Sequence, residues 1–198
     1  MGNEPKMRIS FTGTKISTAK TEFAAQLAKV NKTLQAAVKN GAAKPADRIY
    51  YATRACEGNT SIEIMQASDA QSVGMTNMNK RMLDANNYAL LVGVQLLSAT
   101  ATTADAALTV AFDTVNDTIA NGDFELEIGN KTLIPRSSNQ IFKAAPNQEN
   151  KGLKGYYKLE CPKLLTPLTE IVPTIYLPKA APANTYVKVI LHTAQLIG

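Results

Sequence analysis

The sequence predicts a mainly β protein, an antiparallel β-sandwich or jelly roll preceded by one long amphipathic α-helix. From residue 49 onward, seven to nine short strand-like segments alternate with turn signals. No second long helical pattern separates them, which favours a sandwich or jelly roll over alternating βα units. Helical periodicity is confined to one stretch, about Thr18 to Asn40. We therefore predict a basic N-terminal arm over residues 1–48 and a sandwich domain over residues 49–198.

The N-terminal helix is predicted to be both amphipathic and basic. Its apolar residues recur at spacings of four, three, four and four, which places them on one stripe: Phe23, Leu27, Val30, Leu34 and Val38. Its opposite face carries Lys20, Lys29, Lys32 and Lys39. Two interpretations of this face stay open. The lysines are either the solvated side of a helix that docks on the sheet, or an arm that contacts the phosphates of a polyanion.

The strands are expected, in chain order, at 7–11, 49–54, 61–66, 86–98, 108–112, 123–128, 131–134, 156–160 and 185–193. Segment 86–98 is the longest apolar run, which is typical of a strand buried on both faces. The turn dipeptide Asn121-Gly122 leads into an alternating segment and predicts a hairpin there. In the last strand, we expect Val187 to point inward and Lys188 outward.

Three connecting regions have weaker patterns. We expect a short helical turn near residues 78–83, and a surface loop over the Ala/Thr-rich residues 100–107. Five of the nine prolines fall between Pro162 and Pro182. Because proline cannot donate to an interior ladder, the strand pieces in that region should lie at sheet edges or bends.

Composition excludes several classes of protein. Apolar residues make up 45% and charged residues 19%, a globular balance. Neither a signal peptide nor an apolar run long enough to span a membrane is evident. The two cysteines, Cys56 and Cys161, are too few for a disulfide scaffold and are expected to be reduced, partly buried thiols.

Positive charge is concentrated in the first quarter of the chain. Residues 1–54 contain ten Lys or Arg against three acids, a net charge of +7. The other 144 residues contain eleven against thirteen, a net charge of −2. This asymmetry indicates a polyanionic partner for the N-terminal segment.

No set of residues in the sequence predicts catalysis. The single histidine, His192, lies six residues from the end and has no sequence partner for a triad. One histidine and two distant cysteines cannot fill a zinc site. Glu125 and Glu127 share one side of a strand, where the wet face of a sheet explains them better than acid–base chemistry. We expect no enzyme activity, cofactor or metal.

A second candidate for nucleic-acid contact lies in the segment from residue 151 to 158. Its flexible glycines are combined with lysines and tyrosines, the ingredients of a loop that stacks bases and binds phosphates. The candidate residues are Lys151, Lys154, Tyr156 and Lys158. A hairpin loop flanked by strand tyrosines explains the same pattern.

Three passages together resemble, in their layout, the coat proteins of small icosahedral bacteriophages with jelly-roll subunits. They are Gly74–Met78 leading to Leu83 and the apolar strand, Asn121–Leu126 with its hairpin, and the closing Asn184–Val189. The resemblance covers roughly residues 60–198 and is architectural. It implies a non-enzymatic subunit that assembles in many copies, often with a basic N-terminal segment facing the genome.

The expected function is therefore that of a capsid protein, a structural virion protein that self-assembles into a shell. Its expected partners are copies of itself, other virion proteins and nucleic acid bound by the N-terminal segment. We expect synthesis in the host cytoplasm and a final location in the virion. The alternative is a lectin-like or adhesin-like sandwich that binds a ligand through its loops, and a more distant one is a hydrolase that uses surface carboxylates.

Overall fold

The computed structural model describes residues 32, 36, 40, 44–85, 87–143 and 153–197. The chain divides into two units, Met1–Pro45 with Ile197–Gly198 and Ala46–Leu196. The predicted strand at 7–11 and most of the predicted helix at 18–40 lie outside the described residues. Within that helix, Lys32, Ala36 and Asn40 are described, and each is helical and exposed. These three residues do not by themselves show a long amphipathic helix.

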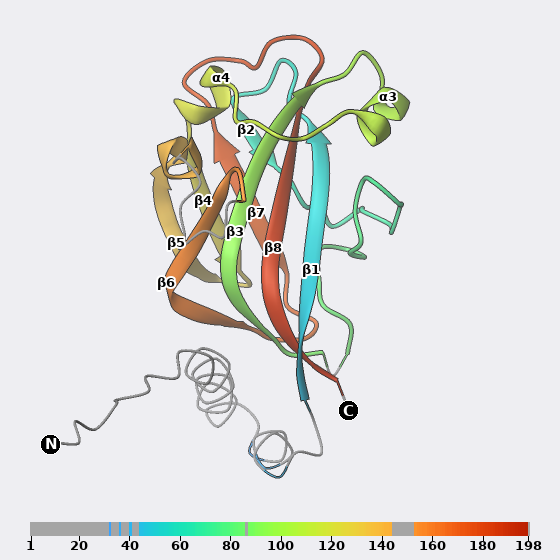
Figure 1. Cartoon of the computed structure of the whole chain (residues 1–198), viewed down its shortest axis with the longest axis vertical. Coiled ribbons are helices and arrows are strands. Elements are labelled where there is room, and N and C mark those ends of the chain that lie inside the picture. The colour runs from blue at the N-terminus through green and yellow to red at the C-terminus, as the bar shows by residue number, and fades with distance from the viewer. Residues whose placement is uncertain are drawn as a thin grey trace, which may run out of the picture. The chain divides into compact units, whose positions relative to one another are not determined.

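The second unit is built from two four-stranded antiparallel sheets (Figure 1). One sheet has the strand order β1-β8-β3-β6 and the other β2-β7-β4-β5. The elements are β1 (Lys44–Ala55), β2 (Ser61–Glu63), β3 (Ala89–Thr100), α3 (Ala104–Thr109), α4 (Asp117–Ala120), β4 (Asp123–Ile128), β5 (Lys131–Ser138), η1 (Asn139–Lys143), β6 (Tyr156–Leu165), β7 (Ile171–Tyr176) and β8 (Thr185–Ile197). The prediction of a mainly β, antiparallel sandwich is confirmed.

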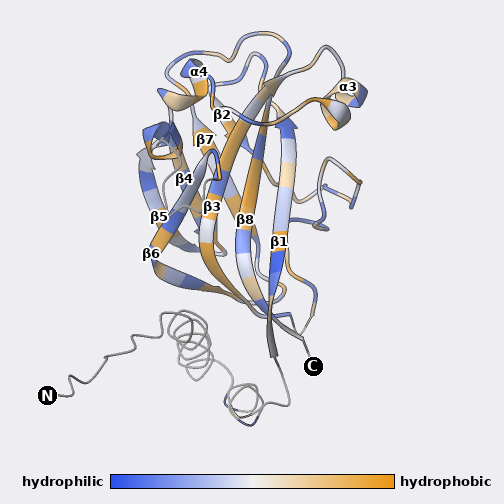
Figure 2. Cartoon of the chain, viewed as in Figure 1, coloured by the Kyte–Doolittle hydropathy of each residue, from blue (hydrophilic) through white to orange (hydrophobic). Residues whose placement is uncertain are grey.

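Alternation of apolar residues fills the space between the sheets. On β4, Phe124, Leu126 and Ile128 are buried in the core, while the acidic residues between them face outward. On β8, Val187 is fully buried in the same core, as predicted. Phe124 also meets Phe142 of η1 edge to face, with ring centroids 5.5 Å apart. The apolar character of the interior strands is visible in Figure 2.

Pro173 contradicts the expectation that the prolines lie at sheet edges or bends. It is part of β7, which lies between β2 and β4. The carbonyl oxygen of Pro173 accepts a hydrogen bond from the Ile64 amide at 2.9 Å, just beyond the end of β2. The Ile64 carbonyl, which would otherwise receive an amide from residue 173, accepts from Arg54 Nε at 3.3 Å. The arginine thus replaces the donor that proline lacks.

Two other local predictions are wrong. Residues 104–109 form the short helix α3, where a loop and then a strand over 108–112 were expected. The Thr103 hydroxyl caps this helix by accepting from the Ala106 amide at 3.0 Å, and alanine has a high helix propensity. Instead of a helical turn near 78–83, Lys80 and Arg81 both have positive φ, at 48° and 50°. This is the pattern of a type I′ turn, closed by a hydrogen bond from the Met82 amide to the Asn79 carbonyl.

Candidate functional site

Segment Ser72–Asn77 covers the free edge of β1. The Thr53 amide donates to the Met75 carbonyl at 2.6 Å, and the Asn77 amide donates to the Tyr51 carbonyl at 3.3 Å. The Asn77 side chain adds two bonds, since its oxygen accepts from the Tyr51 amide and its nitrogen donates to the Ile49 carbonyl. Covering an edge strand in this way blocks uncontrolled strand pairing. It also holds the segment firmly in place.

The tip of this segment presents an apolar side chain to solvent. The Met75 amide closes a turn on the Ser72 carbonyl at 3.0 Å, with Gly74 at φ 85° in the position that favours glycine. Gly74 is fixed on both sides, because its amide donates to the Tyr51 hydroxyl and its carbonyl accepts from the Thr53 hydroxyl. Val73, between these fixed points, is 94% exposed.

Leu108 of α3 and Lys188 of β8 extend this surface. Leu108 is 45% exposed, and its side chain touches Gly74 so closely that a Cβ there would lie 2.8 Å from Leu108 Cδ2. The Lys188 ammonium lies 4.8 Å from the ring centre of Tyr51 and 5.4 Å from that of Phe112. Burial lowers the pKa of Lys188. We call Val73, Leu108 and Lys188 the Val73 surface.

Lys188 is a cation without a carboxylate partner in the described part of the chain. The ion pairs there join Arg54, Arg81, Arg136, Lys143 and Lys154 to acids, and Lys188 is not among them. The two rings supply cation–π attraction, worth about 0.5–1 kcal/mol where solvent has access. The site therefore combines exposed apolar groups with an ammonium that forms no ion pair with any described residue.

A second exposed apolar side chain lies in the turn between β6 and β7. Leu168 is 66% exposed and has φ at 55°, a left-handed backbone that costs a leucine about 1–2 kcal/mol. Two hydrogen bonds tie this region to the preceding segment, from the Leu168 amide to the Leu83 carbonyl and from the Ile171 amide to the Arg81 carbonyl. The Arg81 guanidinium also binds Glu170 at 2.7 Å. We call residues 166–170 the Leu168 turn.

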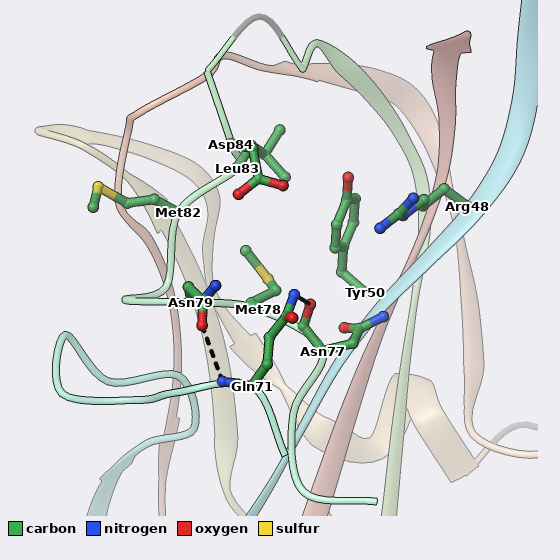
Figure 3. A pocket seen from close by; sticks show the side chains of 9 residues that line it. All are labelled: Arg48, Tyr50, Gln71, Asn77, Met78, Asn79, Met82, Leu83 and Asp84. Carbon is green, nitrogen blue, oxygen red and sulfur yellow. Dashed lines mark hydrogen bonds between the residues drawn. The ribbon is translucent and has the colours of Figure 1, made fainter. Parts of the chain in front are cut away.

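The pocket in Figure 3 is too small for a ligand. It lies between β1 and the segment before β3, and its volume of about 10 Å³ has room for one water molecule. Tyr50 forms one wall, with its hydroxyl donating to Gln195 Oε1 at 3.0 Å and its ring 5.5 Å from the Arg48 guanidinium carbon. Burial raises the pKa of Tyr50. Small-molecule sites are typically 300–1,000 Å³.

The carboxylates singled out in the sequence lie on the outer face of the sheet β2-β7-β4-β5. Glu125 accepts a hydrogen bond from the Tyr176 hydroxyl at 2.9 Å, and this bond raises the pKa of Tyr176. Glu127 is exposed, and the Thr132 hydroxyl lies 3.5 Å from it. The Arg136 guanidinium stacks 4.1 Å from the Tyr176 ring centre and binds Asp123. The expectation that these acids occupy a wet sheet face fits their positions.

Of the candidate nucleic-acid residues, Lys20, Lys29, Lys39 and Lys151 lie outside the described residues. Lys32 is exposed, as is Lys158 on β6. The Lys154 ammonium lies 3.6 Å from the Asp113 carboxylate, while its carbonyl accepts from the Gln95 side chain. Tyr156 packs edge-on against His192, with ring centroids 4.9 Å apart, and burial raises the pKa of its hydroxyl. Lys158 is therefore exposed, whereas Tyr156 is half-buried.

The remaining titratable candidates form no reactive group within the described ranges. His192 Nε2 lies 3.2 Å from Gln95 Oε1. Cys56 is buried, and burial raises the pKa of its thiol to about 12. Cys161 is exposed on the edge strand β6, so the expectation of partial burial is wrong for this thiol. Among the residues that the structure describes, no three His, Cys, Asp or Glu side chains could hold a metal ion. None of the described helices is long and apolar enough to cross a membrane.

Sequence reasoning did not find the Val73 surface or the Leu168 turn. Isolated apolar residues between turn signals are common in loops, so Val73 and Leu168 carried no pattern of their own. Comparison with known proteins found no matching family model, no matching curated protein and no matching solved structure.

Proposed function

We propose that the chain is a jelly-roll subunit that associates with copies of itself to form a virion shell. The strand order supports this proposal. Neighbours in the sheets include β1–β8, β2–β7, β3–β6 and β4–β5. This set of pairs arises when one long hairpin, with β4 and β5 at its tip, is wound so that successive pairs fall into opposite sheets. Eight strands in two such sheets are the jelly-roll arrangement of viral capsid and lectin domains.

Fold alone does not separate a shell subunit from a lectin-like module, because both use this architecture. The charge distribution favours the shell. The first 54 residues have a net charge of +7 and the rest of the chain −2, as suits a sandwich that carries a polyanion-binding segment. The exposed Val73 and Leu168 side chains, each on a turn held by hydrogen bonds, favour protein contacts.

Light scattering and electron microscopy of the purified chain test self-association. We expect large homogeneous particles, or trimers and pentamers, whose abundance rises with protein concentration. A chain that remains monomeric across salt and concentration would contradict the proposal and favour the ligand-binding module.

A separate experiment tests the N-terminal lysines against a polyanion. Changing Lys20, Lys29, Lys32 and Lys39 to glutamine should weaken binding to random single-stranded DNA. It should also reduce the slope of log affinity against log salt by about 0.7 for each phosphate that the variant no longer neutralises. The matched control changes four lysines of the second unit to glutamine: Lys131, Lys143, Lys163 and Lys179. Equal reductions in the two variants would exclude a specific role for the N-terminal segment.

A further inference from the structure

We propose that copies of the chain join head to tail, with the Leu168 turn of one copy seated on the Val73 surface of the next. This inference rests on the proposed self-association and specifies one of its contacts. The two regions belong to different parts of the sandwich, because one caps the edge of β1 and the other connects β6 to β7. A contact between two different patches is heterologous and generates rings or chains of subunits.

Both regions are held in place before any contact forms. Val73 is presented by a turn whose central glycine is hydrogen-bonded through both its amide and its carbonyl. Leu168 is kept in a left-handed conformation by a turn bonded to Leu83. An exposed apolar group on a fixed backbone loses little entropy when it is buried in an interface. Backbone strain kept at an exposed apolar residue also favours a functional position over a structural one.

The charges of the two regions are also complementary. The Val73 surface includes the ammonium of Lys188, which forms no ion pair with a described residue and lies 4.8 Å from the ring centre of Tyr51. The hydroxyl of the same tyrosine accepts from the amide of Gly74, the neighbour of Val73. The Leu168 turn places a carboxylate, that of Glu170, two residues from its apolar side chain. Glu170 binds Arg81 through one oxygen, Oε2, and its side chain is 46% exposed. Each region thus combines an exposed apolar side chain with a charge opposite to that of the other region.

Two aspartate substitutions test the contact. Val73→Asp damages only the receiving surface, and Leu168→Asp damages only the inserting turn. Both side chains are mostly exposed, and aspartate is tolerated in the left-handed conformation of residue 168. Each variant alone should require at least about tenfold more protein than wild type for half-assembly, the effect of removing one strong interface residue. Ile49→Asp, at a third exposed apolar residue, is the matched control and should assemble like wild type.

Mixing the two variants gives the decisive measurement. Val73→Asp keeps an intact Leu168 turn and Leu168→Asp keeps an intact Val73 surface, so one good contact can form between them. With the two variants carrying different mass tags, native mass spectrometry should show a complex containing one copy of each. If either variant assembles as well as wild type, or if the mixture contains no such complex, the head-to-tail contact is wrong. The proposed shell would still be supported in that case, provided that the wild-type chain forms particles. Monomeric wild type would instead overturn the proposed function.

Discussion

Replacing Gly93 with alanine should destabilise the sandwich, because β3 passes beneath the ring of Tyr156 at this residue. A Cβ on Gly93 would overlap the Tyr156 hydroxyl and ring carbons. The register of β3 with both β6 and β8 also shifts between Leu91 and Gly93, so the backbone here is already irregular. The tyrosine ring must therefore move away from the strand in the variant and lose its packing against His192.

The cost of this change has an upper limit set by the ring itself. If the Tyr156 side chain swings into solvent, the loss equals the burial of a half-covered aromatic ring, about 1–2 kcal/mol. Overpacking without that movement costs about 1–3 kcal/mol. We therefore expect Gly93→Ala to lower the free energy of unfolding by about 1–2 kcal/mol, measured by urea titration with circular dichroism.

A double-mutant cycle tests whether the ring is the cause. In a Tyr156→Ala background the added methyl group meets no ring, so Gly93→Ala should cost almost nothing and the interaction energy should be about 1–2 kcal/mol. Tyr156→Phe keeps the ring carbons that overlap the new methyl group and should not restore stability. If the two substitutions Gly93→Ala and Tyr156→Ala are additive within about 0.5 kcal/mol, the steric explanation is wrong.

Three further predictions concern a buried thiol, an ion pair and a strained turn. Because burial raises the pKa of Cys56 from its ordinary 9.0 to about 12, a thiol reagent at pH 8 should label only Cys161 until denaturant is added. The contribution of this shift to the free energy of unfolding is fully present below pH 9 and should be lost as pH rises from 9 toward 12. In urea titrations, Cys56→Ala should show a smaller loss over the same pH range. Arg54→Ala leaves a mostly buried carboxylate unpaired and should cost about 2–4 kcal/mol, whereas Arg136→Ala, in an exposed pair, should cost about 1 or less in the same titration. Leu168→Gly relieves the strain of a leucine in the left-handed backbone conformation and should raise the free energy of unfolding by about 1 kcal/mol. The same substitution should weaken self-association. An unchanged melting temperature would show that the turn is unstrained.

Sequence analysis placed two kinds of strand correctly. In one kind apolar and polar residues alternate between the two faces, and the other kind is a long, nearly unbroken apolar run. Residues 123–128 alternate so regularly that only one register buries the apolar set, and the structure has β4 at these residues. The apolar run 86–98 corresponds to β3, Ala89–Thr100, where buried side chains face both sides. In these segments local periodicity and burial require the same structure, so the strands could be predicted from the sequence alone.

The errors have two different causes, a compensation by a distant residue and a local helix signal that was overlooked. Proline usually excludes an interior strand, yet Pro173 is tolerated there because Arg54, more than a hundred residues earlier, supplies the missing donor to Ile64. Residues 104–109 contain only one large apolar side chain, that of Leu108, and the helix forms because Thr103 caps it and alanine has a high helix propensity. The compensation at Pro173 depends on a contact between segments far apart in the chain, which periodicity does not report.

The candidate interface was beyond sequence reasoning for a related reason. A lone valine at position 73 becomes notable only when the turn around it proves to be fixed on β1, with Leu108 from another segment touching its neighbour Gly74. Lys188 reads as an ordinary outward lysine of an alternating strand, and its position between two rings depends on Tyr51 and Phe112 from separate parts of the chain. Exposure of an apolar group is therefore informative here only in combination with the rigidity of its backbone. That combination distinguishes Val73 from an incidental surface residue, because a mobile loop could turn its valine inward, whereas this turn cannot do so without breaking its bonds to β1.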